Sequence, residues 1–442
     1  MTEQPLPNDE ELMRALNANP QVKNRIASML AVVQDAAGDL KEADAAEMRL
    51  IEEIRLMGQE AMQSWANRQV ELTEQAVRRG GQVQREGKKL CWHTTFGDIR
   101  VEEPQYRRGS KRIRAFAQSA KVSHRGCSRP LQRAVTDFGA DQPFAQVMDK
   151  LVEHYGIVLG ESTIRRITEG HAQKIFETGK APRVWPTQPG GSVVVIVEMD
   201  GGMVPIVEPD STKPDQRKGK KLQWKEAKIC LAHPQGSKTL AYGGTLQGDV
   251  VAAGQQLFDC AVRAGFGTRS HIHAVGDGAP WIADQVEDQF GAKGSYLLDF
   301  FHVCDYLSAA AKAIVPDTEG QKRWKDAQKN RLRTQRSDEL LQTLQAHLEA
   351  PEVEDSQAPV RQCQRYLSHR HEQLDYYSAL ARDLPIGSGE IESAHRYIVQ
   401  QRLKRPGAWW RAANAEHMLA LRLNRANRQW NDYWATESQQ AA

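Results

Sequence analysis

Five consecutive β-branched residues, Val193–Val197, constrain the fold of this chain more than any other stretch of its sequence. An uninterrupted apolar run, in place of an alternating one, is typical of a central strand that is buried on both faces of a sheet. The run ends at the sequence EMDGG of residues 198–202, and we expect a second strand at 203–207 after a tight glycine turn. The sequence therefore predicts that an α/β domain begins near residue 192.

The segments that follow alternate between strand and helix patterns. We expect a third strand at residues 226–232 and a helix at 249–264, and then strands at 271–275 and 295–298, each followed by a helix. Three adjacent strands followed by alternating helices and strands is the element order of an RNase H-like α/β domain. The fold class that we predict is therefore α/β, with a mixed sheet flanked by helices.

A long helical segment interrupts this predicted core. Residues 305–384 are charged and helical in pattern, which favours an all-helical insertion between two parts of the core, residues 192–304 and 385–430. The second part contains a late helix, for which Ser388 is a suitable N-cap. Residues 431–442 are interpreted as a tail.

The N-terminal part of the chain is predicted to be mainly helical. Residues 1–84 form an acidic helical arm, which either pairs protomers or packs within the chain. Residues 85–180 form a DNA-binding region that begins with a hairpin at 88–115, with a turn at Gly97-Asp98. The proline- and glycine-rich residues 181–191 are typical of a linker.

Two helices within residues 130–172 resemble a helix-turn-helix. The first carries an apolar stripe and ends at Gly156, and the second begins with Ser162 as its N-cap and presents Arg165 and Arg166. Two packed helices of an ordinary bundle have the same pattern, so both interpretations stay open.

The net charge conceals a strong segregation of charge along the chain. Lys plus Arg number 59 and Asp plus Glu number 56, so the balance is 59 − 56 = +3. Residues 1–60 carry 12 acidic and 6 basic residues, a balance of −6, whereas residues 61–134 carry 16 basic and 6 acidic residues, a balance of +10. Residues 393–430 carry 8 basic residues and one acidic residue, a balance of +7. Two basic segments of this kind favour a polyanionic partner.

Several classes of protein are excluded by what the sequence lacks. It has no apolar run of membrane-spanning length and no apolar segment of a secretory signal near its start, so we expect no membrane partner. Its six cysteines are scattered without a CxxC pair, which argues against a disulfide framework and a structural zinc cluster.

Three carboxylates stand out by their positions. Asp200 follows the first buried strand, Asp277 follows the predicted strand at 271–275, and Glu392 lies early on the late helix. Neighbouring strands lie about 4.8 Å apart, so acids at strand ends converge. Clustered carboxylates without nearby Cys or His ligands select Mg²⁺ or Mn²⁺, and two such ions can promote phosphoryl transfer. Each acid taken alone is equally explained as a turn or capping residue.

Specific motifs make the sequence resemble the DDE transposases of bacterial insertion sequences, in particular the ISKra-type family, which is related to the Mutator-like enzymes. The resemblance covers residues 193–411 well and 85–175 more loosely. It rests on these motifs in this order: MDGG with Asp200, Trp224 and Glu226 in W-x-E, GDGAPWI with Asp277, DFFH from Asp299 to His302, GSGEIES with Glu392, and QRLKRPGAWW at 401–410.

The resemblance implies a catalytic triad of Asp200, Asp277 and Glu392 that holds two Mg²⁺ or Mn²⁺ ions. It also implies that His302, with Asp299 as an accessory residue, contacts the scissile phosphate or positions a leaving group; a buried structural histidine is the alternative. Trp281 is an accessory residue that stacks on a flipped base or, as its position favours, packs in the core.

Basic residues on three segments are candidate DNA contacts. Arg402 follows Glu392 by nearly three helical turns, which favours a role in holding a backbone phosphate near the metal ions. Trp409 and Trp410 are expected to pack the end of that helix down. The full set of predicted DNA-binding residues is Arg107, Arg108, Lys111, Arg112, Arg114, Arg165, Arg166, Arg402, Lys404 and Arg405.

The function that this resemblance implies is transposition of an insertion sequence, a mobile genetic element, in the bacterial cytoplasm at the nucleoid. Such an enzyme binds the terminal inverted repeats of its element as a homo-oligomer, cleaves DNA and joins the exposed 3′-hydroxyl to target DNA. Two alternatives are a transposase-derived DNA-binding regulator without activity and an RNase H-like structure-specific nuclease.

Overall fold

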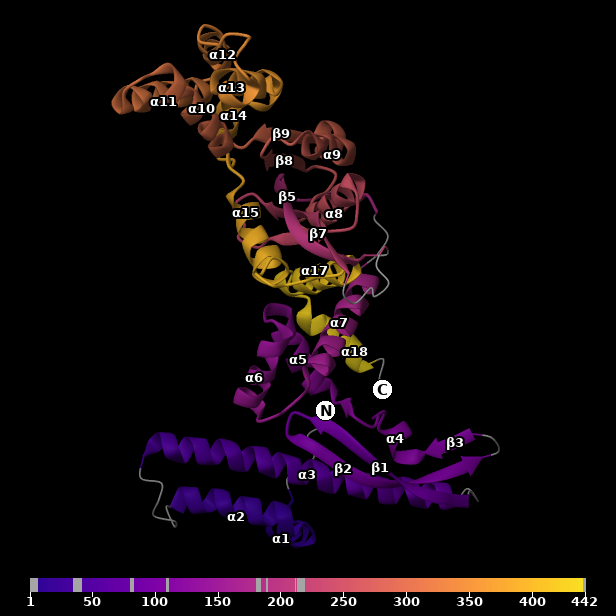
Figure 1. Ribbon diagram of the computed structural model, residues 1–442. Helices are drawn as coiled ribbons and strands as arrows, with labels where there is room; N and C mark the ends of the chain where they lie inside the picture. The colour runs from indigo at the N-terminus through magenta and orange to yellow at the C-terminus, as the bar shows by residue number, and fades with distance from the viewer. Residues whose placement is uncertain are drawn as a thin grey trace. The chain divides into compact units, whose positions relative to one another are not determined.

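The computed structural model forms two compact units (Figure 1). The first comprises Met1–Thr168 and Trp434–Ala442, and the second comprises Glu169–Tyr433. The structure describes residues 7–34, 42–79, 83–108, 111–179, 184–187, 190–210, 212 and 219–439.

Three helices open the first unit, as the sequence predicts. They are α1 (Asp9–Ala18), α2 (Pro20–Gln34) and α3 (Ala43–Arg79). Helix α1 begins with a capping box, in which the Asn8 side chain accepts from the Glu11 N–H and the Glu11 carboxylate accepts from the Asn8 N–H. Neither α1 nor α2 buries a residue fully, and α3 packs against a sheet.

The sheet of the first unit has four strands in the order β3-β2-β1-β4. One face of β1 and β2 carries apolar residues, which pack with α3 and with Phe116 of the short helix α4 (Ala115–Ser119). The strands are β1 (Val83–Thr94), β2 (Gly97–Arg108), β3 (Lys111–Arg114) and β4 (Gly126–Cys127).

The predicted hairpin is confirmed, but its turn lies two residues earlier than expected. Gly97 pairs with Thr94, and Asp98 pairs with His93, so both residues belong to β2. The chain reverses at residues 95–96, where the Thr94 hydroxyl accepts from the Phe96 N–H and donates to the Gly97 carbonyl. Gly97 has a φ of +120°, a conformation that favours glycine, and this requirement explains its place beside the turn.

The two helices that resemble a helix-turn-helix are α6 (Phe144–Tyr155) and α7 (Glu161–Thr178), preceded by α5 (Arg129–Asp141). Gly156 ends α6 in the left-handed conformation, with φ +61°, as the sequence predicts. The second helix begins at Glu161, so Ser162 lies in its first turn and is not its cap.

Both predicted arginines of the second helix, Arg165 and Arg166, are exposed, while Ile164 and Ile167 are buried in the core of the bundle. This placement satisfies the sequence pattern, and it is shared by a DNA-reading helix and by an ordinary bundle helix.

The second unit is built on a five-stranded sheet in the order β7-β6-β5-β8-β9. Strands β5, β6 and β7 pair antiparallel, and β8 and β9 run parallel to β5. In sequence order the strands are β5 (Val194–Pro209), β6 (Lys220–Pro234), β7 (Ala241–Thr245), β8 (His271–Gly276) and β9 (Gly294–Leu298).

Five strands were expected, but their division is different. The predicted strands at 193–197 and 203–207 are one continuous strand, β5, which passes through Gly201 and Gly202 without a turn. The strand predicted third is therefore second, and β7 was missed. The prediction failed because glycine pairs are common in turns, whereas here they leave space for neighbouring side chains. A Cβ at Gly201 would meet the Glu226 carboxylate, and one at Gly202 would meet the His395 ring.

Helices cover both faces of this sheet. Helices α8 (Val250–Arg263) and α9 (Pro280–Phe290) enclose one apolar core with β5, β6 and β8. A second apolar core joins β5 and β9 to α10 (Phe300–Ile314) and to the helical insertion. The insertion, orange in Figure 1, contains α11 (Thr318–Arg333), α12 (Ser337–Gln345), α13 (Pro359–Ser368) and α14 (Tyr376–Ala381).

The chain returns to the sheet after the insertion. Helix α15 (Gly389–Ala394) continues into a π-helical stretch (His395–Gln400) and α16 (Gln401–Leu403). Helix α17 (Ala412–Ala426) then lies against β7, where buried Glu416 accepts hydrogen bonds from Thr245, Leu246 and Gln247. The last helix is α18 (Trp430–Gln439).

Among the described helices, none combines the length and the apolar character that crossing a membrane requires.

Candidate functional site

Three acidic residues come shortly after the last parallel pairs of the second sheet, and we call Asp200 and Asp277 together the rung. The last parallel pair between β5 and β8 is Glu198 with Val275, and that between β8 and β9 is Gly276 with Leu298. Continued past the ends of β8 and β9, these registers, with offsets of 275 − 198 = 77 and 298 − 276 = 22, predict that Asp200, Asp277 and Asp299 follow one another across the sheet edge. Adjacent strands are about 4.8 Å apart, so the backbones of these residues are neighbours. Asp200 lies within β5, where its partner β8 stops, and not at a strand end as predicted.

The Asp200 carboxylate has few partners and is half-buried. It accepts a hydrogen bond from the Gly201 N–H at 2.7 Å. With its proton on Nε2, His395 donates to the Asp200 carbonyl at 3.1 Å, and this nitrogen lies 3.5 Å from Asp200 Oδ2. Burial raises the pKa of Asp200; His395 and the Gly201 N–H oppose this rise, and the charge of Asp277 adds to it. Two acids that destabilise each other's charge in this way form a fitting site for a cation.

The loop that carries Asp277 is held tightly by hydrogen bonds to its backbone. The Asp277 carboxylate accepts from the Ala279 N–H at 2.9 Å, which fixes the local turn. The Tyr366 hydroxyl donates to the Asp277 carbonyl at 2.6 Å, and Arg370 Nε donates to the Gly278 carbonyl at 2.8 Å. Gly278 has a φ of +89°, and a Cβ there would meet Arg370 and Leu298. The helical insertion therefore positions the Asp277 loop.

Asp299 is a positioning residue and not a free carboxylate. It is buried, and its Oδ1 caps α10 by accepting from the Phe301 N–H at 2.6 Å and the His302 N–H at 3.1 Å. Its Oδ2 accepts from the Ser388 N–H at 2.6 Å and hydroxyl at 2.5 Å. The sequence predicts Ser388 as the N-cap of the late helix. Ser388 does precede α15, but its side chain does not cap the helix and instead ties the start of α15 to Asp299.

Helix α15 is also fixed to β5 by Glu198. The Ile391 N–H donates to Glu198 Oε2 at 2.8 Å, and the Glu198 side chain is buried. Burial raises the pKa of Glu198 to about 8, although the Ile391 N–H opposes this rise, so the side chain is neutral at pH 7. A neutral Glu198 adds no charge to the nearby Asp200.

Glu392 is exposed on α15, one helical turn before His395. Residues three apart on a helix are neighbours, so Glu392 lies on the helix face next to the side chain that contacts Asp200. Within the described residues, Asp200, Asp277 and Glu392 do not all bring their oxygens within 4.8 Å of one another. All three offer oxygen ligands, which is the donor chemistry that Mg²⁺ and Mn²⁺ require.

His302 and Trp281 occupy different surroundings. His302 lies half-buried in the first turn of α10, and its charge lowers the pKa of Asp200, which places it within electrostatic reach of the rung. Trp281 packs against the core formed by α8, α9 and the sheet, in agreement with the core interpretation.

The basic residues after α15 are not all surface cations. Arg402 is buried, and its guanidinium lies 4.7 Å from the centre of the Trp410 ring, so this placement does not support a phosphate contact. Lys404 is exposed and Arg405 is half-buried. Trp410 is buried as predicted, but Trp409 is 64% exposed, contrary to the expectation that both tryptophans pack down.

The predicted DNA-binding residues of the hairpin also differ in their exposure to solvent. Arg107 and Arg112 are exposed and lie opposite each other in the β2–β3 register. Arg114 is half-buried and forms an ion pair with buried Glu103 at 2.7 Å, so its charge is neutralised locally. Two further predicted residues have side chains outside the described part of the chain: Arg108 and Lys111.

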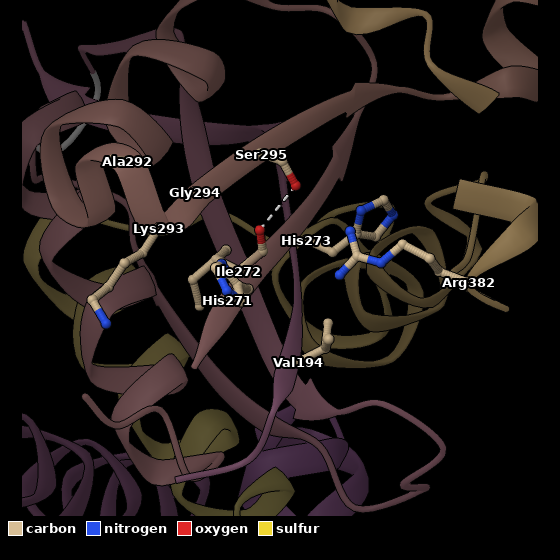
Figure 2. Close-up of a pocket in the computed structure, with 9 residues that line it drawn as sticks. All are labelled: Val194, His271, Ile272, His273, Ala292, Lys293, Gly294, Ser295 and Arg382. Carbon is tan, nitrogen blue, oxygen red and sulfur yellow. Dashed lines mark hydrogen bonds between the residues drawn. The ribbon is translucent and has the colours of Figure 1, made fainter. Parts of the chain in front are cut away.

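Two cavities lie against the second sheet, and only the first is on the side of the acidic residues. One, of about 280 Å³, is lined by Glu198, His233 and Glu390, with a His233–Glu390 ion pair at 3.0 Å. The other, of about 190 Å³, lies at the opposite edge of the sheet, where β5, β8 and β9 begin (Figure 2). Lys293 and Arg382 contribute to its lining. Ligands of open α/β sheets bind beyond the carboxyl ends of the strands, which here is the Asp200–Asp277 edge.

Comparison with known proteins gives one partial match. Residues 267–434 match the sequence profile of an uncharacterised protein family (UPF0236). This region includes Asp277 and Glu392 but not Asp200. No curated protein matches the chain.

Several residues of the site were missed by reading the sequence. Glu198 was hidden because its buried partner, the Ile391 N–H, is 193 residues away. Tyr366 and Arg370 belong to a charged helical segment whose pattern indicates only exposed helices. His395 had a detectable signal, because it follows Glu392 by one helical turn.

Proposed function

We propose that this protein is a DDE transposase of the ISKra type that cleaves and joins DNA with Mg²⁺ or Mn²⁺. The observation that carries the proposal is that Asp200 and Asp277 each lie two residues beyond the last parallel pair of β5 and β8, with the Glu392 helix fixed to β5 through Glu198 and His395. The sheet order, with three antiparallel strands followed by two parallel ones, supports an RNase H-like core.

The proposed chemistry follows from these residues. Two bound ions would activate the attacking oxygen and stabilise the leaving oxygen of a phosphodiester. Asp200, Asp277 and Glu392 would hold the ions, and His302 would contact the scissile phosphate. Water attacks the phosphodiester at the element end and leaves a 3′-hydroxyl and a 5′-phosphate. This hydroxyl would then attack a target phosphorus, form a new P–O bond and displace the target's 3′-oxygen, which leaves as a 3′-hydroxyl, in a direct transesterification. The positioning of the Asp277 loop by Tyr366 and Arg370 keeps the two aspartates aligned during both steps.

An exposed aromatic and basic surface supports a nucleic-acid partner. Trp224 is 52% exposed, with Lys404 Nζ 5.9 Å from its ring centre, and Trp409 has Lys220 Nζ 4.9 Å from its ring centre. The Val207 N–H donates to the Trp410 carbonyl, which fixes this loop beside β5. Exposed tryptophans provide stacking surfaces for bases, and lysines neutralise phosphates. We propose that the tryptophan–lysine surface (Trp224, Trp409, Lys220 and Lys404) contacts DNA.

We also propose that the protein acts as a homo-oligomer on the ends of its element at the bacterial nucleoid, through the helices α1–α3. Large apolar side chains on these helices are exposed, among them Leu30, Val33, Ile51 and Ile54. Such side chains on amphipathic helices favour association with a second copy.

The test uses DNA that carries the inverted repeats flanking the coding sequence. Asp277→Asn should retain end binding but lose Mg²⁺-dependent cleavage and strand transfer, while Asp284→Asn, an exposed charge on α9, should behave like the wild type. Cleavage by Asp277→Asn at the wild-type rate would contradict the proposal. Binding without any cleavage by the wild type would indicate a regulator. Cleavage of branched junctions without strand transfer would indicate a nuclease.

A further inference from the structure

A second group of potential metal ligands lies in the first unit, on the β1–β2 hairpin. Ligand atoms of Cys91, His93 and Asp98 all lie within 4.8 Å of one another, the only set of three His, Cys, Asp or Glu ligands this close in the described residues. Cys91 and His93 are two residues apart on β1, and Asp98 is the cross-strand partner of His93. Side chains in these positions point to the same face of a sheet.

That face is the one not used by the apolar core. Leu90, Trp92 and Ile99, which alternate with the three ligands along the strands, pack with α3 on the opposite face. Cys91, His93 and Asp98 are each half-buried, so the ligand face is partly accessible to solvent. A metal ion there would be reachable from solvent and would not disturb the core.

The distances resemble those of a tetrahedral site. Cys91 Sγ lies 3.6 Å from Asp98 Oδ2, and His93 Nδ1 lies 2.6 Å from Asp98 Oδ1. Bonds of about 2.3 Å to sulfur and about 2.1 Å to nitrogen or oxygen separate tetrahedral ligands by about 3.4–3.6 Å. The first distance already matches this geometry. The second is a hydrogen bond that must lengthen by less than about 1 Å, by rotation of the half-buried His93 and Asp98 side chains.

The neighbouring strand β4 carries the candidate for a fourth ligand. Cys127 is the parallel partner of His93, so its side chain projects from the same face. The Cys127 side chain packs partly against the core of α5–α7 and is not among the ligands that already lie within 4.8 Å of one another, so its thiol must rotate toward them to complete a four-coordinate set of two thiolates, an imidazole and a carboxylate.

We propose that Cys91, His93, Asp98 and Cys127 bind one structural Zn²⁺ ion. Mixed sulfur and nitrogen ligands in four-coordinate geometry favour Zn²⁺ over the Mg²⁺ expected for the oxygen-only site of the other unit. The proposal departs from the sequence expectation of no zinc cluster, because Cys91 and Cys127 are 36 residues apart and two of the four ligands are not cysteines, so no spacing pattern marks them. Binding releases the thiol protons to solvent as the thiolates coordinate the ion.

The ion would fasten three parts of the first unit to one another. Cys91 and His93 lie on β1, Asp98 lies just after the hairpin turn, and Cys127 directly precedes Ser128, whose hydroxyl caps α5 by accepting from the Leu131 N–H. The Ser128 N–H also donates to the His93 carbonyl at 2.7 Å. A metal bond at Cys127 would therefore fix the start of the bundle of α5, α6 and α7 to the hairpin.

The experiment titrates the full-length, chelator-treated protein with Co²⁺, followed by competition with Zn²⁺. One Co²⁺ ion per chain should give the visible bands of tetrahedral cobalt and a charge-transfer band whose intensity corresponds to two thiolates, in addition to any Co²⁺ that the oxygen ligands of the second unit bind without thiolate bands. Zn²⁺ should abolish both signals and raise the melting temperature. Absence of the charge-transfer band, or an intensity corresponding to no thiolate, overturns the proposal and leaves the trio as a hydrogen-bonded turn.

Matched variants locate the ion. Cys91→Ser and Cys127→Ser should each lose one thiolate from the cobalt spectrum and weaken binding at least tenfold, whereas Cys304→Ser should retain the full signal. Asp277→Asn should also retain it, so failure of this site is distinguishable from failure of the proposed catalytic site. Loss of the signal in Cys304→Ser, with retention in Cys91→Ser, overturns the assignment. If a cysteine variant fails to fold, as judged by circular dichroism, the thiolate count of the wild type still decides.

Discussion

The Asp200–Asp277 rung and the Cys91–His93–Asp98 face use the same device with opposite chemistry. In both, neighbouring strands bring side chains together at matching register positions. The rung joins carboxylates 77 residues apart; the Tyr366 hydroxyl donates to the Asp277 carbonyl, and the Ile391 N–H donates to Glu198, two residues before Asp200. The hairpin face joins mixed ligands whose side chains contact one another directly. The comparison shows that register supplies proximity, whereas the donor atoms determine which ion is suited to the site.

The substitution with the largest expected effect lies at the rung. Asp200→Asn removes a charged oxygen ligand, so DNA cleavage should fall by about 10⁴-fold while end binding is retained. Single-turnover cleavage and a gel-shift assay measure the two effects. Asp98→Asn, the corresponding change on the hairpin, should leave the cleavage chemistry unaffected once the DNA is saturated with protein. Equal losses in the two variants would mean that the two sites are not independent.

The second effect concerns the buried acid beside the rung. The folded-state pKa of Glu198 is about 8, above that of the unfolded chain, so the folded state binds the extra proton between about pH 5 and pH 8. Stability should therefore fall as pH rises through this window, by at most about 1.4 kcal/mol per pH unit. Glu198→Gln keeps an acceptor for Ile391 and should flatten this dependence in thermal melts in magnesium-free buffer. Parallel melting curves for the two proteins would refute the neutral Glu198.

The third prediction distinguishes the role of the Zn²⁺ ion from that of the Mg²⁺ ions. Removing Zn²⁺ should destabilise the first unit by about 3 kcal/mol relative to a concentration 100-fold above the dissociation constant. Removing Mg²⁺ alone should abolish cleavage without a comparable loss of stability. Calorimetry in the presence of a zinc-selective chelator, with and without Mg²⁺, measures both. An identical melting curve with and without Zn²⁺ would argue against a structural ion.

The smallest effect is expected at the support of the rung. Tyr366→Phe removes the hydroxyl that donates to the Asp277 carbonyl, and loss of such a supporting contact costs about 10-fold in activity or metal affinity. Tyr377→Phe on α14, an exposed tyrosine, is the matched control. A cleavage rate and Mg²⁺ dependence unchanged in Tyr366→Phe would show that the insertion does not position the loop.

Particular residues show what the sequence could and could not predict. The β-branched run identified the central strand, and helical periodicity identified α6, because both patterns reflect local burial. The glycines after Asp200 were misread as a turn, because the Glu226 and His395 side chains that require them come from distant segments. Arg402 looked like a phosphate ligand by helical spacing, and only its packing on Trp410 shows otherwise. Long-range partners of this kind leave no periodic signal.

The attachment of the Asp277 loop to α13 has a consequence for anyone who edits the chain. Trimming the helical insertion to a short linker, as one would to obtain a minimal core, would remove Tyr366 and Arg370 together with the segment that appears dispensable. A truncated version would then keep every acid of the rung and still misplace one of them. Any minimal design must graft a replacement for those two anchors.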